Sequence, residues 1–253
     1  MEANEMQSRV SRIRASDRLA GVEALTAQLQ VQGSGSSIQP APDLELVRFV
    51  GRYGAVAINH VMSVLAVRRS MAYRRVAACV ERGLLERLEL VRAEPTLLRA
   101  TRAGLRYAGL GLEVATVSPG SINHWLVCAS TALLLAEEAD LDQVLSDREL
   151  RLYERIEGKP IASAKMGEHP SGAQALHRPD LAIVADGRRL AVEVELTPKA
   201  PGRLARIVRA WRRASWVDEV RYYCAPGAAR RGVEQAIRKV HTDRVRVLEA
   251  PRR

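Results

Sequence analysis

The chain has 253 residues, of which 47% are hydrophobic and only 4% aromatic, so a core built mostly from Leu, Val, Ile and Ala is expected. Its formal net charge of +10 fits a polyanionic partner such as nucleic acid, and net charge alone fits a soluble basic protein without a specific partner equally well. Three widely spaced cysteines argue against a disulfide framework, and the longest apolar run, from Leu126 to Ala136, is too short to span a bilayer. We therefore expect a cytoplasmic protein that does not associate with a membrane.

The positive charge is concentrated in two blocks. Residues 40–110 contain twelve Lys or Arg against six Asp or Glu, and residues 201–253 contain fourteen against five. The stretch between these blocks is acidic overall. This distribution predicts two basic surfaces separated by a region of different function.

Residues 1–42 are expected to form a flexible tail and linker. The first part has helical periodicity and is compatible with a short amphipathic helix or with disorder. The stretch "GSGSSIQPAP" that follows has the composition of a flexible linker.

Residues 43–112 are predicted to form a winged helix-turn-helix domain. The pattern indicates three helices, with Ser70 as the expected N-cap of the third, then a hairpin with Glu94-Pro95 in its turn, then a helix capped by Thr101. In such a domain the third helix enters the major groove of DNA and the wing contacts the backbone. The alternative is a protein–protein module whose arginines are only solvated.

Basic residues cluster where such a domain contacts DNA. The candidates on the third helix and the wing are Arg68, Arg69, Ser70, Tyr73, Arg74, Arg75 and Arg92. A second basic stripe is predicted on a helix that follows the acidic region, at Arg206, Arg209 and Arg213.

Residues 118–253 are predicted to form a second, α/β domain with a mixed sheet. The order is a buried helix from Ser121, an ambiguous strand or helix over 141–156, a long loop over 157–176, a hairpin with an Asp186-Gly187 turn, and then helix, strand, helix and strand. The loop is expected to be functional or mobile because of its length.

Three acids lie within the predicted hairpin. Glu193 and Glu195 are two apart and so share one face of a strand, while Asp180 begins the neighbouring strand. Three clustered carboxylates repel one another unless a divalent cation neutralises them, and carboxylate oxygens suit Mg²⁺ or Mn²⁺. The alternative is a half-exposed strand with ordinary solvated acids.

This region resembles the PD-(D/E)xK nuclease superfamily in three features: Pro179-Asp180, the hairpin that follows, and Glu193-x-Glu195. The resemblance implies a restriction-endonuclease-like fold in which Asp180 and Glu193 bind metal. It also implies a Lys at position 195, where this chain has Glu195, and Lys199 is expected to reach back to that place. Glu137 and Glu138 are candidates for a further acid on the first helix, with Asp147 and Glu149 as weaker candidates.

The chain resembles the replication-relaxation family of plasmid and mobile-element proteins over roughly residues 43–240. The resemblance rests on the order of the winged helix, "SDRELR", "HRPD" and "VEVELTPK". The family name implies a role in plasmid replication or DNA topology. The acids between two basic blocks predict a metal-dependent endonuclease that binds double-stranded DNA, whereas Glu195 in place of Lys favours a catalytically inactive DNA-binding regulator or replication accessory factor. A homodimer is one option for its assembly. A protein-interaction scaffold is a third interpretation, which leaves both basic blocks unexplained.

Few other residues suggest chemistry. His177 adjoins the acids and could assist them, whereas His124 and the remaining histidines are scattered without the spacing of metal ligands. Trp211 and Trp216 are expected to fill the core. A glycine-rich phosphate loop is absent from the sequence, which disfavours nucleotide hydrolysis.

Overall fold

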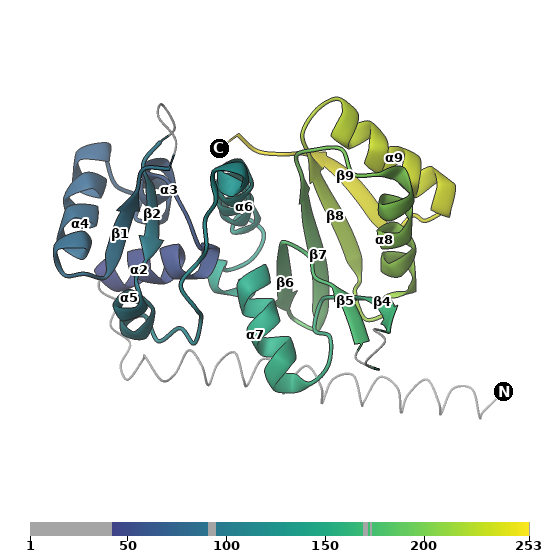
Figure 1. Cartoon of the computed structure of the whole chain (residues 1–253), viewed down its shortest axis with the longest axis horizontal. Coiled ribbons are helices and arrows are strands. Elements are labelled where there is room, and N and C mark those ends of the chain that lie inside the picture. Colours follow the sequence, from purple (N-terminus) through teal and green to yellow (C-terminus); the bar gives the residue numbers. More distant parts are fainter. Residues whose placement is uncertain (1–41, 91–94, 169–171, 173, 253) are drawn as a thin grey trace.

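The computed structural model describes residues 42–90, 95–168, 172 and 174–252 (Figure 1). Over these residues the protein is a mixed α/β structure with eight α-helices and a mixed five-stranded sheet, as the predicted mixed α/β class requires. Some predicted features lie outside the described residues: the tail and linker, Glu94 of the expected turn, and Arg92. Among the described helices, none has the length and apolarity to cross a membrane.

The N-terminal unit has the predicted order of helix, helix, helix, hairpin and helix. Its elements are α2 (Pro42–Tyr53), α3 (Ile58–Val64), α4 (Arg69–Glu81), β1 (Leu85–Leu88), β2 (Leu97–Ala100) and α5 (Arg102–Tyr107). Thr101 caps α5 as predicted, because its hydroxyl accepts the Gly104 amide. The predicted cap at Ser70 is wrong: the N-cap is Arg68, two residues earlier, and it has no side-chain cap.

The C-terminal unit is built around the larger sheet. Its elements are α6 (Ile122–Leu135), β3 (Val144–Ser146), α7 (Asp147–Glu157), β4 (Ala164–Glu168), β5 (Gln174–His177), β6 (Leu181–Ala185), β7 (Arg188–Glu195), α8 (Pro201–Arg213), β8 (Glu219–Cys224), α9 (Ala228–Val240) and β9 (Val245–Glu249). Two short 3₁₀ turns, Pro119–Ser121 and Leu141–Gln143, precede α6 and β3.

Two segments differ from what the sequence indicates. Residues 141–156, ambiguous between strand and helix, contain both β3 and α7. The predicted long loop over 157–176 instead contains the antiparallel hairpin β4–β5. A bulge between Lys165 and Gly167 interrupts its alternation, and Ala164 and Met166 gain their apolar contacts only from the cluster around α8, which explains why the local pattern is weak.

The strand order of the sheet is β3-β6-β7-β8-β9. β3, β6 and β7 pair antiparallel, whereas β7, β8 and β9 pair parallel through the crossover helices α8 and α9. The predicted β6–β7 hairpin is confirmed, with Asp186 and Gly187 both at positive φ (49° and 75°), as a type I′ turn requires.

Helices cover both faces of the sheet (Figure 1). On one face α8 and α9 bury Trp211 and Val233 against Ala191 and Tyr222, and α7 packs beside them on β3 and β6. On the other face lies α6, and beyond it the N-terminal unit. One continuous apolar cluster joins α2, α6 and the sheet; it includes Leu46, Val50, Ala129, Ala132, Leu181 and Val192.

A buried guanidinium also joins the two units. Arg52 of α2 donates from Nε to Glu149 Oε1 (2.8 Å), and its terminal nitrogens bond Asp142 and the carbonyls of Leu141 and Val144. Glu149 in turn caps its own helix, because its Oε2 accepts the amide and hydroxyl of Ser146. Burial disfavours the charged form of Arg52, but the negative charge of Glu149 outweighs burial and raises the pKa of Arg52.

We predict that Arg52→Ala lowers the free energy of unfolding by about 3–5 kcal/mol, because Glu149 is left buried without its partner charge. Urea denaturation followed by circular dichroism measures this. Arg151→Ala is the control, because its side chain is exposed and its ion pair is with Asp147 one turn away, so a change within about 0.5 kcal/mol is expected. Equal effects of the two substitutions would show that the buried network does not hold the units together.

Candidate functional site

The three predicted acids lie at one end of the sheet. Glu193 and Glu195 share the face of β7 that α8 covers, and each residue is only 3% exposed. Leu181 pairs with Val192, so Asp180, one residue before β6, lies across from Glu193. The three acids thus lie near one another at this end of the sheet, and Glu193 and Glu195 are buried rather than solvated.

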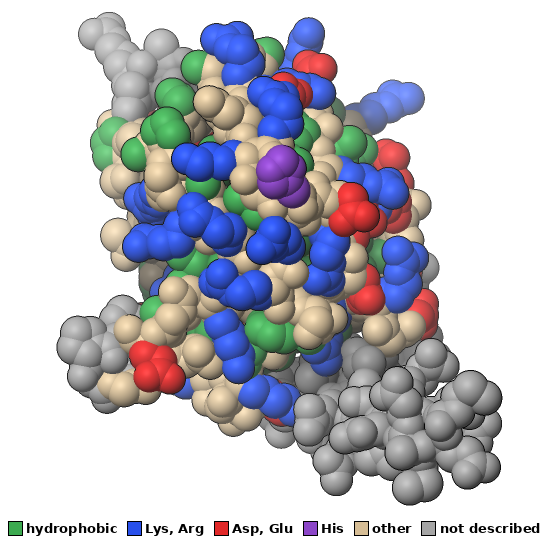
Figure 2. Space-filling view, turned by 90° about the vertical axis from the view of Figure 1, so that its right-hand side faces the viewer, with side chains coloured by type: hydrophobic (Ala, Val, Ile, Leu, Met, Phe, Trp, Pro, Cys, Tyr) green, Lys and Arg blue, Asp and Glu red, His purple; other side chains and the backbone are tan. Residues whose placement is uncertain are grey.

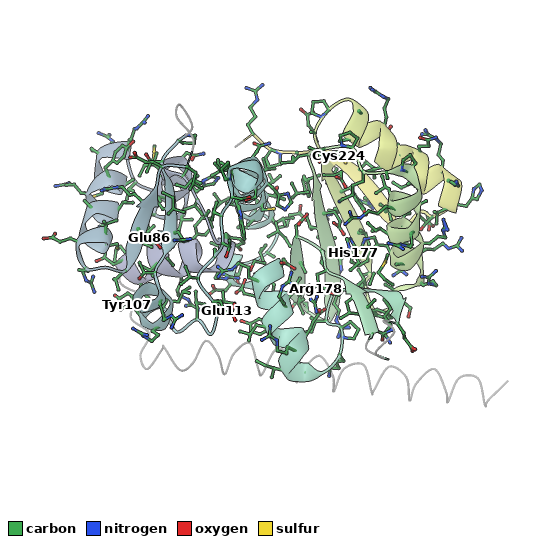
Figure 3. The ribbon with its side chains drawn as sticks, viewed as in Figure 1. Glu86, Tyr107, Glu113, His177, Arg178 and Cys224 are labelled. Carbon is green, nitrogen blue, oxygen red and sulfur yellow. The ribbon has the colours of Figure 1, made fainter. Side chains whose placement is uncertain are left out.

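Each acid has its own basic partner. His124 of α6 lies 3.0 Å from Asp180 Oδ1, His177 lies 2.6 Å from Glu193 Oε1, and Lys199 donates to Glu195 Oε2 at 2.5 Å. Figure 3 shows His177 where β5 leads toward the sheet. The buried charges are therefore compensated within the chain, as buried charges must be.

Neutral donors fix two of the acids further. The backbone amide of Val194 donates to Asp180 Oδ2 (2.7 Å), so the other oxygen is directed at His124. The indole of Trp211 donates to Glu193 Oε1 (3.2 Å). Trp211 is fully buried, as predicted, but it also contributes this polar contact to the site.

Lys199 reaches back to Glu195 as the sequence predicts. Burial alone would lower the pKa of its ammonium, but Glu193, Glu195 and Asp180 together raise it, so the side chain stays charged. Burial raises the pKa of Glu195 despite the neighbouring ammonium. The Lys199 ammonium thus lies beside position 195, although position 195 itself holds a glutamate.

Both histidines beside the acids are biased toward protonation. The hydrogen bond that His124 donates to Asp180 raises the pKa of His124. Burial acts against protonation of His177, but the charge of Glu193 outweighs it, and the pKa of His177 is raised. Both imidazoles therefore keep their protons to a higher pH than an ordinary histidine does.

The acids do not converge on a single point. Among the described residues, the group of side chains whose ligand atoms lie within 4.8 Å of one another is His124, Cys128 and Asp180, not Asp180, Glu193 and Glu195. The expectation that the histidines lack ligand spacing is wrong for His124. Its separation of four residues from Cys128 puts both on one face of a helix, and this spacing was the available signal.

The expected additional acids lie elsewhere. Glu138 follows the far end of α6 from His124 and binds Arg221 (2.8 Å), and Glu137 adjoins it. Glu149 is engaged by Arg52. Asp147 is closest to the site, because its backbone amide donates to the Asp180 carbonyl (2.9 Å), but its carboxylate binds Arg151.

The predicted basic face of α4 is exposed. Arg68, Arg69, Ser70, Tyr73 and Arg74 are exposed and Arg75 is partly covered by an ion pair with Asp43 (3.4 Å). The Arg69 guanidinium lies over the Tyr73 ring, 5.6 Å from its centroid. The helix is at the end of the molecule opposite α8 and α9 (Figure 1).

A second basic surface covers α8 and α9, and Figure 2 shows it densely covered with Lys and Arg. Its exposed residues are Arg203, Arg206, Arg209, Arg212, Arg213, Arg231, Arg238 and Lys239. The opposite side of α8 packs on the sheet through Trp211, which bonds Glu193. Helix α8 thus stands between the predicted arginine stripe and the acids.

Solvent reaches the acids from the end of the sheet. The side chains of His124, Lys199 and Asp180 are 42%, 28% and 24% exposed, whereas those of Glu193 and Glu195 are nearly closed off. A molecule that enters from this side meets Asp180 and Lys199 first.

Comparisons of the chain with protein-family models and with curated proteins give no match.

We predict that Glu193→Gln lowers the pKa of His177, because burial then acts without the compensating carboxylate. The raised pKa means that the pair's contribution to stability is complete below the usual histidine pKa of about 6.5 and is lost as pH rises through the folded-state value. The stability difference between the wild type and the variant should therefore be largest in mildly acidic solution. Histidine NMR titration and urea denaturation at several pH values measure both effects.

Glu249→Gln, an exposed position on β9, is the control and should change neither quantity. An unchanged His177 titration in Glu193→Gln would contradict the pairing.

Proposed function

We propose that this chain is a DNA-binding protein that hydrolyses phosphodiester bonds with a divalent metal ion, as expected for a plasmid or mobile-element protein of the replication-relaxation type. The observation that carries the proposal is the buried pair Glu193 and Glu195 beside Asp180, with the Lys199 ammonium on Glu195. The order of α6, the β6–β7 hairpin, α8 and β8 around these residues resembles the PD-(D/E)xK nuclease core, which supports the proposal.

Asp180 and Glu193 have a donor set that suits Mg²⁺ or Mn²⁺. Both offer carboxylate oxygens, the hard ligands that these ions prefer. Glu193 Oε1 accepts from His177 and Trp211, and within the described residues no donor reaches its Oε2. Asp180 is partly exposed at the entrance. An ion bound there would polarise the phosphodiester and lower the pKa of a water molecule.

The remaining side chains have roles that follow from their contacts. Lys199 carries a positive charge at the entrance and can hold a phosphate oxygen or orient the attacking water while Glu195 fixes its position. His177 and Trp211 hold Glu193 in place, and the Val194 amide holds Asp180. A site held by such neighbours is preorganised for the charge that develops during hydrolysis.

Targeting is assigned to the N-terminal unit as a winged helix-turn-helix. Helix α4 presents Arg69 and Arg74 to solvent, and neither forms an ion pair with an acid of the described residues. Unpaired arginines on an exposed helix are available to phosphates and base edges. The basic face of α8 and α9 would hold a further stretch of the phosphate backbone.

A second candidate function is DNA binding without hydrolysis. The observation that favours it is the complete internal pairing of the acids, because His124, His177 and Lys199 compensate Asp180, Glu193 and Glu195 without any metal. In that case the site is a polar core of a regulator or replication accessory protein.

The hydrolytic function predicts that the protein nicks supercoiled plasmid in Mg²⁺ or Mn²⁺. Asp180→Asn, Glu193→Gln and Lys199→Ala should each lower the rate by about 100-fold or more, since each removes a group worth several kcal/mol in the transition state. Glu138→Gln is the control, because this acid is exposed and lies at the far end of α6. Wild-type DNA binding without nicking would favour the regulator, and nicking that survives all three substitutions would exclude this site.

Both functions predict that DNA affinity depends on α4. The double variant Arg69→Ala, Arg74→Ala should weaken binding and reduce the slope of log affinity against log salt by about 1 for each phosphate that the helix no longer neutralises. Fluorescence anisotropy over a salt series measures this. Arg151→Ala on α7 is the control for a general reduction of positive charge. An unchanged affinity and salt slope in the double variant would exclude α4 as a DNA-binding helix.

A further inference from the structure

Three side chains of different chemistry converge beside the acids. His124 and Cys128 are one turn apart on α6, and Asp180 comes from the sheet. Cys128 Sγ lies 3.5 Å from His124 Nε2, which lies 3.0 Å from Asp180 Oδ1. Imidazole, thiol and carboxylate are all established ligands of zinc.

Two of the three separations are close to those between ligands of one tetrahedral ion, and the ligand atoms of Cys128 and Asp180 lie within 4.8 Å of each other. With zinc–ligand bonds of about 2.0–2.3 Å, nitrogen and sulfur ligands of one ion lie about 3.6 Å apart, and nitrogen and oxygen ligands about 3.4 Å apart. The observed 3.5 Å and 3.0 Å need an outward movement of only a few tenths of an ångström. The flexible His124 side chain, 42% exposed, can supply it.

Hydrogen bonding alone does not account for this convergence. Both Asp180 Oδ1 and Cys128 Sγ lie against the same nitrogen, Nε2, and a neutral or charged imidazole has at most one hydrogen there. That hydrogen serves the aspartate at 3.0 Å, and among the described residues the sulfur has no hydrogen-bond partner other than this nitrogen at 3.5 Å. A cation at the centre would satisfy all three atoms at once.

The surroundings hold the three ligands in place. The Val194 amide binds Asp180 Oδ2 and leaves Oδ1 directed at His124. Val127, Val194 and Leu196 form an apolar wall around Cys128, which is buried. An apolar wall on one side and solvent on the other are typical of a metal site with an open coordination position.

We propose that His124, Cys128 and Asp180 form a binding site for one thiophilic divalent ion of the zinc class, with water as the fourth ligand. This inference goes beyond the proposed hydrolysis and does not require it. It also has a consequence for that function, because Asp180 cannot fully serve a zinc ion and a Mg²⁺ or Mn²⁺ ion together. Zinc would therefore compete with the metal of the hydrolytic site.

The test is a titration of the full-length, chelator-treated protein with Co²⁺, which replaces zinc and is coloured. We expect one equivalent of Co²⁺ to give visible bands of tetrahedral intensity and a near-ultraviolet thiolate-to-cobalt band, both abolished by excess Zn²⁺. Cys128→Ser should remove the thiolate band, and His124→Ala should weaken Co²⁺ binding by roughly tenfold or more.

Two variants keep the outcome interpretable. His124→Ala changes a partly exposed side chain, so it tests the site even where Cys128→Ser does not fold. Circular dichroism checks the folding of both variants. Cys79→Ser alters another buried cysteine outside the group and should leave the thiolate band unchanged. No thiolate band in the wild type, or a band that survives Cys128→Ser, would overturn the proposal.

Glu193→Gln separates this inference from the proposed function. It should abolish plasmid nicking while leaving the Co²⁺ spectrum intact, because Glu193 is not one of the three ligands. A cobalt site without nicking leaves the zinc proposal standing, and nicking without a cobalt site leaves the hydrolytic proposal standing.

Discussion

The guanidinium of Arg52 is the constraint on which the arrangement of the two units depends. It is a buried charge on the last turn of α2, and its partners all come from the segment between Leu141 and Glu149. That segment contains β3 and the start of α7, and the Asp147 amide then binds the Asp180 carbonyl. A short chain of hydrogen bonds thus runs from the N-terminal unit to the acids. Because a buried charge without partners is so costly, neither unit can move away while Arg52 remains in place.

Much of the sheet was predictable from local pattern. The Asp186-Gly187 turn requires two residues at positive φ, and that requirement is visible in the sequence. Alternation places Glu193 and Glu195 on one face whatever the rest of the chain does. Lys199, four residues further on, was within reach of Glu195. These features depend on neighbours in the sequence, so single-sequence reasoning was sufficient for them.

The remaining features depend on residues far apart in the chain. Arg52 and Glu149 are 97 positions apart, and nothing near either residue indicates the pairing. The β4–β5 hairpin is stabilised by packing near α8 rather than by its own pattern. His124 approaches Asp180 only because α6 packs on β7, although its spacing from Cys128 was visible. The pairing of each acid with its own base likewise required the folded arrangement.

That pairing also shapes the electrostatic field of the molecule. Three carboxylates face two histidines and a lysine, so the acid cluster is close to neutral when both imidazoles are protonated. A nearly neutral cluster adds little repulsion to the potential felt by an approaching polyanion. The long-range field is then set by the arginines of α4, α8 and α9 at the two ends of the molecule (Figure 1). As the histidines lose their protons the cluster becomes a local negative centre, and a phosphate group at the entrance meets a barrier that was absent at lower pH.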